Sequence, residues 1–226
     1  MKRVVIPEWL DSDAGTPEEI AASLTDLNSI NRRFGGISTT HALIAEVSRR
    51  TALRTISLLE VAAGTGSVPE AVAGNLRQSG VDLTVTLLDR AASHLRNGNG
   101  RAVAADASSL PFSDNSFDLV SSNLFLHHLE PGEIVRFLDE GLRVCRIAVL
   151  VNDLVRSRLH LSFVYAGLPL FHCRLTRHDA PASVRRAYTV EEMRAMAEKS
   201  NAARTDLMRH FLFRFGAICW KQDPPK

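Results

Sequence analysis

Three acidic residues stand at the ends of three successive strand-like segments. They are Glu60, Asp89 and Asp106, which lie in or directly after the apolar runs 56–62, 83–88 and 102–105. In a parallel α/β sheet the carboxyl ends of the strands meet at one edge, and ligands bind in the crevice outside that edge. Carboxylates placed there suit a cationic group, the two hydroxyls of a ribose and the amino group of an adenine. The series therefore predicts a site for a nucleoside-like ligand.

A glycine turn follows the first of these acids. The turn Ala62-Ala63-Gly64-Thr65-Gly66 separates the apolar run from a helical pattern at Val68 to Gln78. Small residues let the backbone approach a ligand, and the start of a helix offers free N–H groups to a carboxylate. A lone glycine turn is a weak signal, and strand-terminal acids are often plain turn residues. Their order and spacing together favour the ligand site.

Strand-like and helix-like segments alternate through the middle of the chain. The predicted strands are 56–62, 83–88, 102–105, 117–121 and 147–151, with helices between most of them, and the tail 203–221 adds two strands as a hairpin. This alternation predicts an α/β protein with a doubly wound, mainly parallel sheet and helices on both faces.

Capping boxes mark helices near both ends of the chain. Thr16-Pro17-Glu18-Glu19 predicts a helix that Gly35 and Gly36 end, followed by a second helix from Ser38 to about Thr51. Thr189 to Glu192 predicts another helix, which runs to about Ser200. We expect residues 1–52 to form a helical cover over the cleft, with a homodimer contact as their alternative role. Residues 53–226 then form the main domain, with a lid insertion at about 155–188.

Composition limits the kind of protein. The 226 residues are 45% hydrophobic and carry a formal net charge of +2, which suits one globular domain and does not by itself indicate a nucleic-acid or membrane partner. Cys145, Cys173 and Cys219 are far apart and odd in number, so neither a disulfide framework nor a zinc site is predicted. The first residues lack the apolar core of a signal peptide, and no apolar run approaches a membrane span. We expect a cytoplasmic protein.

These motifs in this order resemble the class I S-adenosyl-L-methionine-dependent methyltransferases. The resemblance covers about residues 55–151 and includes the segments 110–120 and 123–129. It implies a Rossmann-like sheet of seven strands whose last strand is antiparallel. It also implies that Glu60 lies near the methionine amino group, Asp89 on the ribose and Asp106 on the adenine. The residues that this resemblance implies for the cofactor are Glu60, Ala62, Gly64, Thr65, Gly66, Asp89, Arg90, Asp106, Ala107, Asn123 and Leu124. The product would be S-adenosyl-L-homocysteine.

The chain departs from the family pattern at one point. The usual first glycine of the loop is Ala62 here, and the frequent cysteine is Ala63. Alanine has less backbone freedom than glycine, which puts the position of this loop in doubt.

The outer segments are similar to a narrower group, the small bacterial methyltransferases associated with type III polyketide synthases. The similarity lies in residues 28–36, 151–158 and 177–188. It implies a small aromatic acceptor, phenolic or quinone-like, methylated on oxygen. The residues we expect at the acceptor are Arg32, Phe34, Asn152, Arg156, His178 and Arg186.

Two adjacent histidines are the candidates for catalysis. Methyl transfer from a sulfonium is an in-line displacement, in which the enzyme holds the reacting atoms in line and excludes water. No metal is required. A phenol with a pKa of about 10 benefits from a base near neutral pH, and histidine is the usual one. His127 and His128 follow the fourth strand, close to the expected methyl group, although either could instead cap or pack the next turn.

Three other functions stay open at this point. An RNA methyltransferase of the same fold would use the arginines between Arg156 and Arg186, yet it predicts a wider basic stripe and more aromatic residues than the 6% present. A nicotinamide dehydrogenase is disfavoured because the loop lacks the third glycine of its fingerprint. A protein that binds the cofactor without turnover is the third alternative.

Overall fold

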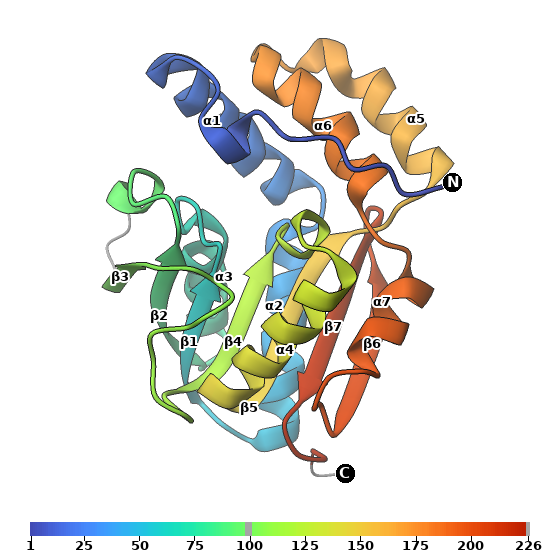
Figure 1. Cartoon of the computed structure of the whole chain (residues 1–226). Coiled ribbons are helices and arrows are strands. Elements are labelled where there is room, and N and C mark those ends of the chain that lie inside the picture. Colours follow the sequence, from blue (N-terminus) through green and yellow to red (C-terminus); the bar gives the residue numbers. More distant parts are fainter. Residues whose placement is uncertain (98–100, 225–226) are drawn as a thin grey trace.

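The part of the chain that the structure describes, residues 1–97 and 101–224 of a computed structural model, contains one seven-stranded sheet (Figure 1). The strands are β1 (Thr55–Val61), β2 (Asp82–Asp89), β3 (Arg101–Ala104), β4 (Phe117–Asn123), β5 (Cys145–Leu154), β6 (Arg204–His210) and β7 (Arg214–Trp220). Their order is β3-β2-β1-β4-β5-β7-β6. β1 to β5 pair in parallel, whereas β7 is antiparallel to both β5 and β6. The predicted fold class, including the C-terminal hairpin, is confirmed.

Helices cover both faces of this sheet. The helices are α1 (Pro17–Arg33), α2 (Gly36–Thr51), α3 (Ser67–Gln78), α4 (Pro131–Val144), α5 (Arg158–Gly167), α6 (Arg174–Arg186) and α7 (Val190–Ala197). Four short 3-10 turns join them, namely η1 (Leu10–Ser12), η2 (His94–Asn97), η3 (Leu126–His128) and η4 (Leu168–Leu170). α2 and α3 pack on one face, and α4 and α7 pack on the other.

Adjacent strand residues serve opposite faces of the sheet. Leu58 packs with α2 and α3, while its neighbour Leu59 packs with α4 and α7. Leu119 and Val120 on β4 divide in the same way. Side chains alternate along a strand, so a sheet buried on both faces needs apolar residues at successive positions. This requirement explains the continuous apolar runs in the sequence.

Two reciprocal caps start helices where the sequence predicts them. The Thr16 amide donates to the Glu19 carboxylate at 3.0 Å, and the Glu19 amide donates back to the Thr16 hydroxyl at 3.3 Å. Thr189 and Glu192 form the same pair at the start of α7, with distances of 2.8 and 3.1 Å. These bonds satisfy N–H groups that a helix start leaves free, which fixes where each helix begins.

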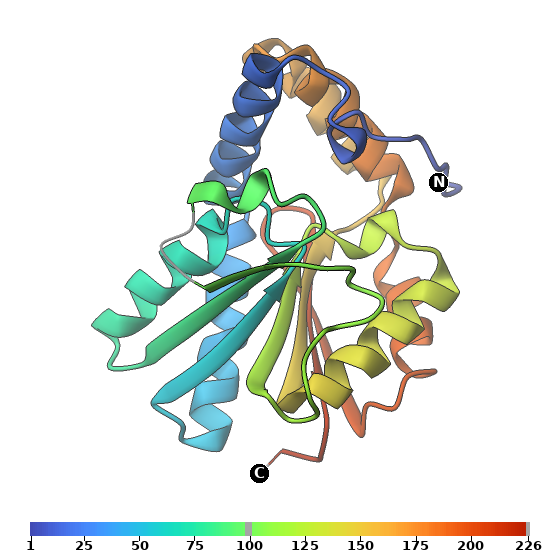
Figure 2. The ribbon, with the colours of Figure 1, turned by 60° about the vertical axis from the view of Figure 1, so that its left-hand side comes forward.

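An upper layer lies over the carboxyl ends of the strands. It contains α1, α5, α6 and the N-terminal segment, which we define as residues 1–12 (Figures 1 and 2). The Asp179 carboxylate on α6 accepts from the backbone N–H groups of Trp9 and Leu10 at 2.9 and 3.0 Å, which fastens the segment to the layer. The predicted cover of residues 1–52 therefore divides: α1 belongs to this layer, whereas the apolar face of α2 packs on the sheet.

Candidate functional site

Two of the three predicted acids, Asp89 and Asp106, and the loop after β1 border one cavity at the carboxyl ends of β1, β2 and β3. The cavity has a volume of about 510 Å³. The residues predicted for the cofactor that line it are Ala62, Gly64, Asp89, Arg90, Asp106, Ala107 and Leu124. His127, His128 and Arg186 line it as well. The structure thus brings together most of the site that the sequence predicts.

The loop after β1 uses left-handed backbone at three positions. Ala62, Gly64 and Gly66 have φ angles of 55°, 53° and 72°. Glycine adopts this conformation freely, whereas alanine does so at a cost of about 1–2 kcal/mol. At Gly66 a Cβ atom would lie 2.5 Å from the end of the Leu87 side chain, which would have to shift, in addition to the strain of the positive φ. Ala62 therefore keeps the turn that the missing glycine would form.

Asp89 fastens this loop to the second strand. Its Oδ2 atom accepts the Gly64 N–H at 2.8 Å, and its Oδ1 atom accepts the Ala91 N–H at 2.9 Å. The carboxylate remains on the cavity wall, and each of its oxygens has a further lone pair for a ligand hydroxyl.

Asp106 lies on the cavity wall beyond β3. It accepts the Ser108 N–H at 2.7 Å, and hydrogen bonds from Ser108 lower the pKa of the carboxyl below its usual range. Asp106 is therefore charged at neutral pH and able to accept a hydrogen bond from a ligand amino group.

Glu60 lies beneath the loop instead of on the cavity wall. Its side chain is buried and accepts a hydrogen bond from the Ser121 hydroxyl. Burial raises the pKa of Glu60 to about 7, against the opposing effect of the Ser121 hydrogen bond. Of the three predicted acids, Asp89 and Asp106 share the cavity and Glu60 does not line it.

Thr65, Gly66 and Asn123 also stand behind the cavity wall. Thr65 lies 3.5 Å from Asn28 of α1, between the hydroxyl and the amide oxygen. Asn123 donates to Asn31 at 3.2 Å and accepts from Arg214 at 3.0 Å. These contacts hold α1 against the loop, so the side chains position the cavity wall.

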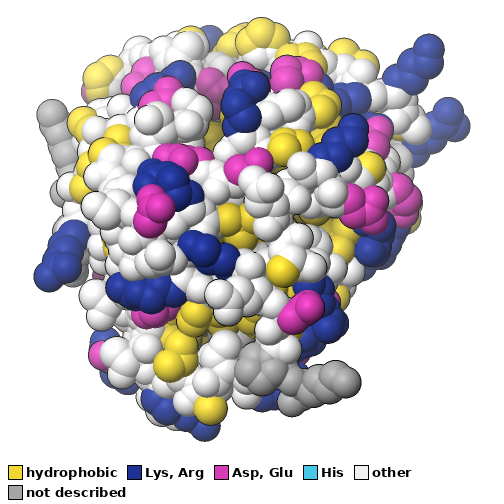
Figure 3. Space-filling view, turned by 60° about the horizontal axis from the view of Figure 1, so that its bottom comes forward, with side chains coloured by type: hydrophobic (Ala, Val, Ile, Leu, Met, Phe, Trp, Pro, Cys, Tyr) yellow, Lys and Arg dark blue, Asp and Glu magenta, His cyan; other side chains and the backbone are white. Residues whose placement is uncertain are grey.

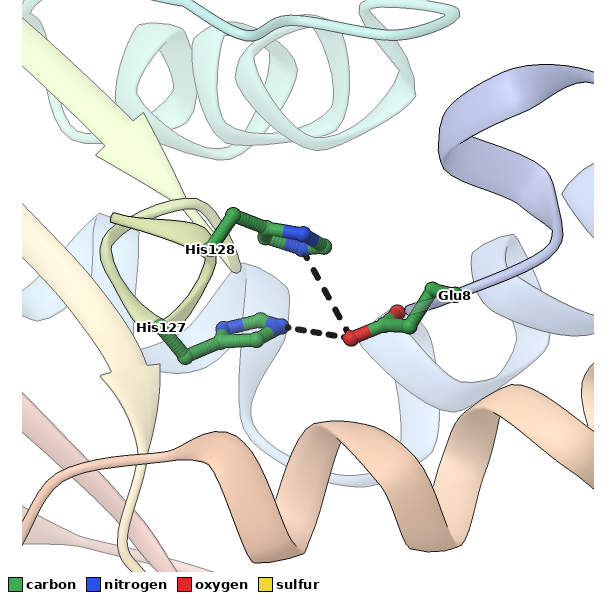
Figure 4. A group of neighbouring side chains, drawn as sticks. All are labelled: Glu8, His127 and His128. Carbon is green, nitrogen blue, oxygen red and sulfur yellow. Dashed lines mark ion pairs between the residues drawn. The ribbon is translucent and has the colours of Figure 1, made fainter. Parts of the chain in front are cut away.

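His127 is buried between two carboxylates, one on each side of its ring. Its Nδ1 atom lies 2.7 Å from Asp153 Oδ1, and its Nε2 atom lies 3.5 Å from Glu8 Oε1 (Figure 4). Burial alone would lower the pKa of His127, but Asp153 and Glu8 outweigh it and raise the pKa to about 10. In this state His127 is an imidazolium at neutral pH.

His128 shares the same carboxylate. Its Nε2 atom lies 3.9 Å from Glu8 Oε1, and its Nδ1 atom lies 2.9 Å from Asp11 Oδ2. Arg186 donates to the backbone carbonyl of His128, which holds η3 against α6. Both imidazoles therefore point their Nε2 atoms at one oxygen of the N-terminal segment.

A second cavity of about 690 Å³ adjoins the first and is mostly apolar. Its apolar side chains include Ile30, Phe34, Phe163, Val164, Leu170, Phe171, Leu212 and Phe213. The two cavities share Glu8, Leu10, Leu27, Leu124, Leu154 and Ser183. Glu8 thus marks the junction between the cavity with acidic walls and the cavity with apolar walls.

Some of the residues predicted for the acceptor line a cavity, whereas others hold neighbouring helices and strands together. Phe34 lines the second cavity and Arg186 lines the first. Asn152 is buried, donates to the Gly36 carbonyl at 2.8 Å and so fastens α2 to β5. Arg156 is buried and pairs with Glu192 at 2.6 Å.

His178 and Arg32 also lie outside both cavity walls. His178 stacks on Trp9 with 3.9 Å between the ring centres, and Arg32 is exposed at the end of α1. Asn152, Arg156 and His178 are thus occupied in holding segments together, so the structure does not bring them to either cavity wall.

Sequence reasoning missed Glu8 and Asp153. Asp153 ends β5, so the rule that singled out the other strand-terminal acids applies to it as well. Glu8 carries no such signal, because it meets His127 only through the packing of the N-terminal segment.

Comparisons with known proteins agree with this geometry. Residues 58–147 match a family model described as a methyltransferase domain. The solved structure of the plantazolicin methyltransferase BpumL, in complex with a monoazolic desmethylPZN analog and SAH, is 12% identical, with a TM-score of 0.68 over 95% of this chain and 93% of that one.

Two further solved structures are S-adenosylmethionine-dependent methyltransferases from Methanosarcina mazei and Aquifex aeolicus. They are 17% and 15% identical, with TM-scores of 0.54 and 0.53 over 77% and 79% of this chain and 96% and 88% of theirs. No curated protein sequence matches the chain. At these identities the solved structures show a shared fold.

Proposed function

We propose that this chain, an S-adenosylmethionine-dependent methyltransferase, transfers the methyl group to an oxygen atom of a small aromatic acceptor of the phenolic or quinone-like class. The observation that carries the proposal is the pair of adjoining cavities, one with acids at strand ends and one with apolar walls. A methyl group must pass directly from one ligand to the other, so two ligand sites that meet at a junction suit this reaction.

The first cavity is the cofactor site in this proposal. Asp89 would accept the ribose hydroxyls and Asp106 the adenine amino group, in keeping with their places on the wall. The start of α3 directs its free N–H groups toward the loop, where a carboxylate is favoured. The methionine amino group would then lie against the loop, with Glu60 buried beneath it.

The second cavity is the acceptor site. Most of its wall is aromatic or aliphatic, which favours an apolar ring, while Asp26, Arg33 and Arg214 supply a few charged groups at its border. The plantazolicin methyltransferase, whose crystal contains an azole analog and SAH, has this fold over 95% of the present chain. That likeness supports a small heteroaromatic or aromatic acceptor.

The histidine pair at the junction would handle the charge of the acceptor oxygen. His127 carries a positive charge that Asp153 holds in place from behind. An acceptor hydroxyl that enters beside this imidazolium would release its proton to solvent and bind as the oxygen anion, which the positive charge favours. The oxygen then forms a bond to the methyl carbon as the carbon–sulfur bond breaks, which yields the methyl ether and S-adenosylhomocysteine.

An RNA acceptor finds less support. Several arginines of the segment 156–186 are engaged within the protein, among them Arg156 with Glu192, Arg174 with Glu19 and Arg186 with Asp11. On the face shown in Figure 3, basic side chains stand beside acidic ones instead of forming a stripe. Among the described residues, no helix is long and apolar enough to cross a membrane.

A methyl-transfer assay tests the proposal. The protein is incubated with S-adenosylmethionine carrying a labelled methyl group and with phenols, hydroxyquinones and, in parallel, total RNA. We expect label in a phenolic or hydroxyquinone methyl ether, and Phe34→Ala should raise the KM for that acceptor several-fold because it removes an apolar wall. Arg32→Ala, at an exposed position two residues away and outside both cavity walls, is the matched control. Label in RNA, or cofactor binding without transfer to any acceptor, would contradict the proposal.

A further inference from the structure

We propose that Glu8, His127 and His128 form a binding site for one divalent first-row transition-metal ion such as Zn²⁺ (Figure 4). The sequence predicted no metal, since methyl transfer needs none and the three cysteines lack the spacing of a zinc site. The site becomes visible only when the N-terminal segment lies against η3.

The three ligand atoms converge on one point. Glu8 Oε1 lies 3.5 Å from His127 Nε2 and 3.9 Å from His128 Nε2, and all three atoms lie within 4.8 Å of one another. Ligands at roughly 2.0–2.2 Å from a tetrahedral ion stand about 3.3 Å apart. A small inward movement of the exposed edge of His128 therefore completes the arrangement. Two imidazoles and one carboxylate form a donor set that first-row ions favour.

Glu8 provides an independent indication of a ligand. Its side chain is only 9% exposed, and its Oε1 atom makes no hydrogen bond: its contacts with His127 Nε2 and His128 Nε2 are ion-pair distances of 3.5 and 3.9 Å. A buried carboxylate oxygen without a partner is costly, and such atoms call for an explanation. An ion bound between this oxygen and the two Nε2 atoms would satisfy it.

The Nδ1 atom of each imidazole, opposite the proposed ion, lies within hydrogen-bond distance of a carboxylate, as is usual for metal-binding histidines. His127 Nδ1 lies 2.7 Å from Asp153, and His128 Nδ1 lies 2.9 Å from Asp11. A carboxylate that accepts the Nδ1–H selects the tautomer whose Nε2 lone pair is free for an ion. Both adjacent histidines have such a carboxylate, and this favours metal binding over simple packing of the two rings.

The local charge also suits a divalent cation. The carboxylates of Glu8, Asp11 and Asp153 surround the imidazoles, and one guanidinium, that of Arg186, faces Asp11 and His128. Arg3 reaches the backbone of this turn but pairs with Glu130. A bound ion replaces the Nε2 proton of His127. The carboxylates of Glu8, Asp11 and Asp153 then carry more negative charge than Arg186 offsets, and the divalent ion neutralises the excess.

The position of the site gives the ion a role that rests on the proposed function. Glu8 lines both cavities, so an ion bound to it stands at their junction. There it would take over from the His127 proton as the positive centre and bind the acceptor oxygen as an anion.

Metal binding tests the site directly. The full chain is dialysed against a chelator and titrated with Zn²⁺ by calorimetry, and Co²⁺ is added in parallel to record the absorption of its coordinated form. We expect one ion per chain and a higher melting temperature in its presence, because an ion that binds only the folded state stabilises it. Glu8→Gln should weaken Zn²⁺ binding at least tenfold, and Asp153→Asn should weaken it by about 10–100-fold.

His172→Gln is the matched control, since His172 is an exposed histidine outside the group. Its Zn²⁺ affinity should equal that of the unmodified protein. Far-UV circular dichroism checks that each variant folds. A lack of stoichiometric binding, an unchanged affinity in Glu8→Gln, or an equal loss in His172→Gln would overturn the proposal.

Labelled methyl transfer separates this inference from the proposed function. Loss of transfer after chelation, with recovery on addition of Zn²⁺, supports an ion at the acceptor oxygen. Full transfer by the chelated protein overturns that role and leaves the proposed function intact. Stoichiometric Zn²⁺ binding without transfer to any acceptor in either state supports the site and counts against the proposed function.

Discussion

At the scale of single residues, the same kind of side chain has different chemistry in different surroundings. Asp106 lies on the cavity wall with a lowered pKa because it accepts hydrogen bonds from Ser108. Glu60 lies under the loop with a pKa raised to about 7 because burial disfavours its charge. Both are acids at strand ends in the sequence, and only their environment separates a charged carboxylate on the cavity wall from a carboxyl that titrates near neutrality.

The buried carboxyl predicts a pH-dependent stability. Because the pKa of Glu60 is higher in the folded protein than in the unfolded chain, its protonated form favours folding below about pH 4.5, and this contribution is lost as the pH rises through 7. Between pH 5 and 8 we expect the protein to lose on the order of 2 kcal/mol relative to Glu60→Gln. Urea unfolding at several pH values measures the difference.

The control for this experiment is Glu198→Gln, an exposed glutamate at the end of α7. Its stability should follow that of the unmodified protein across the same pH range. A constant difference between the unmodified protein and Glu60→Gln from pH 5 to 8 would show that Glu60 does not titrate as the structure indicates.

At the scale of elements, one buried arginine joins three of them. Arg214 at the start of β7 donates to Asn31 at the end of α1, to Asn123 on β4 and to Asn152 on β5, at 2.9, 3.0 and 3.1 Å. It also donates to the Phe34 carbonyl at 2.6 Å. Burial lowers the pKa of Arg214 to about 10. The planar guanidinium, with donors in several directions, lets one side chain serve all these acceptors.

Replacement by lysine tests this junction. Arg214→Lys keeps the charge but cannot reach all four acceptors, so buried oxygens lose their partners, at an expected cost of about 1–3 kcal/mol. The measurement is the free energy of unfolding in urea.

Arg209→Lys on β6 is the matched control, because Arg209 is exposed and its contact with Glu191 is 3.4 Å long. It should change stability by less than about 0.5 kcal/mol. If both substitutions change the free energy of unfolding by the same amount, the hydrogen bonds of Arg214 do not stabilise the fold beyond what an exposed arginine contributes.

At the scale of the whole molecule, the upper layer contributes wall residues to both cavities, among them Leu27 of α1 and Ser183 of α6. The N-terminal segment crosses it and carries Glu8 and Asp11 to the histidine pair (Figure 2). Asp179 on α6 holds that segment through the Trp9 and Leu10 amides. The geometry of the junction thus depends on a contact between the N-terminal segment and α6.

Loosening this contact should open the junction. In Asp179→Ala both amides lose their acceptor, so we expect faster hydrogen exchange in the segment 4–12 and a higher KM for the acceptor, while exchange in β1 and β4 is unchanged. Mass spectrometry of exchanged peptides makes the comparison.

Asp114→Ala serves as the control, since Asp114 pairs with Arg143 at the surface and such pairs contribute little. Unchanged exchange in the segment 4–12 of Asp179→Ala would show that other contacts hold the N-terminal segment in place.

Local patterns in the sequence determined much of this protein. Apolar runs at successive positions predicted strands buried on both faces, capping boxes predicted the starts of α1 and α7, and strand-terminal acids predicted the wall that holds Asp89 and Asp106. These features depend on neighbours a few residues apart, so the chain itself displays them.

Only the tertiary structure decided how the junction is built. Glu8 meets His127 across 119 positions of the chain, and Asp153 and Asp11 support the two imidazoles from different elements. Asn152 and Arg156, which look equally suited to a ligand in the sequence, are instead occupied by Gly36 and Glu192. Which polar side chain faces a cavity and which one fastens the framework depends on how distant segments pack, and no local periodicity records that packing.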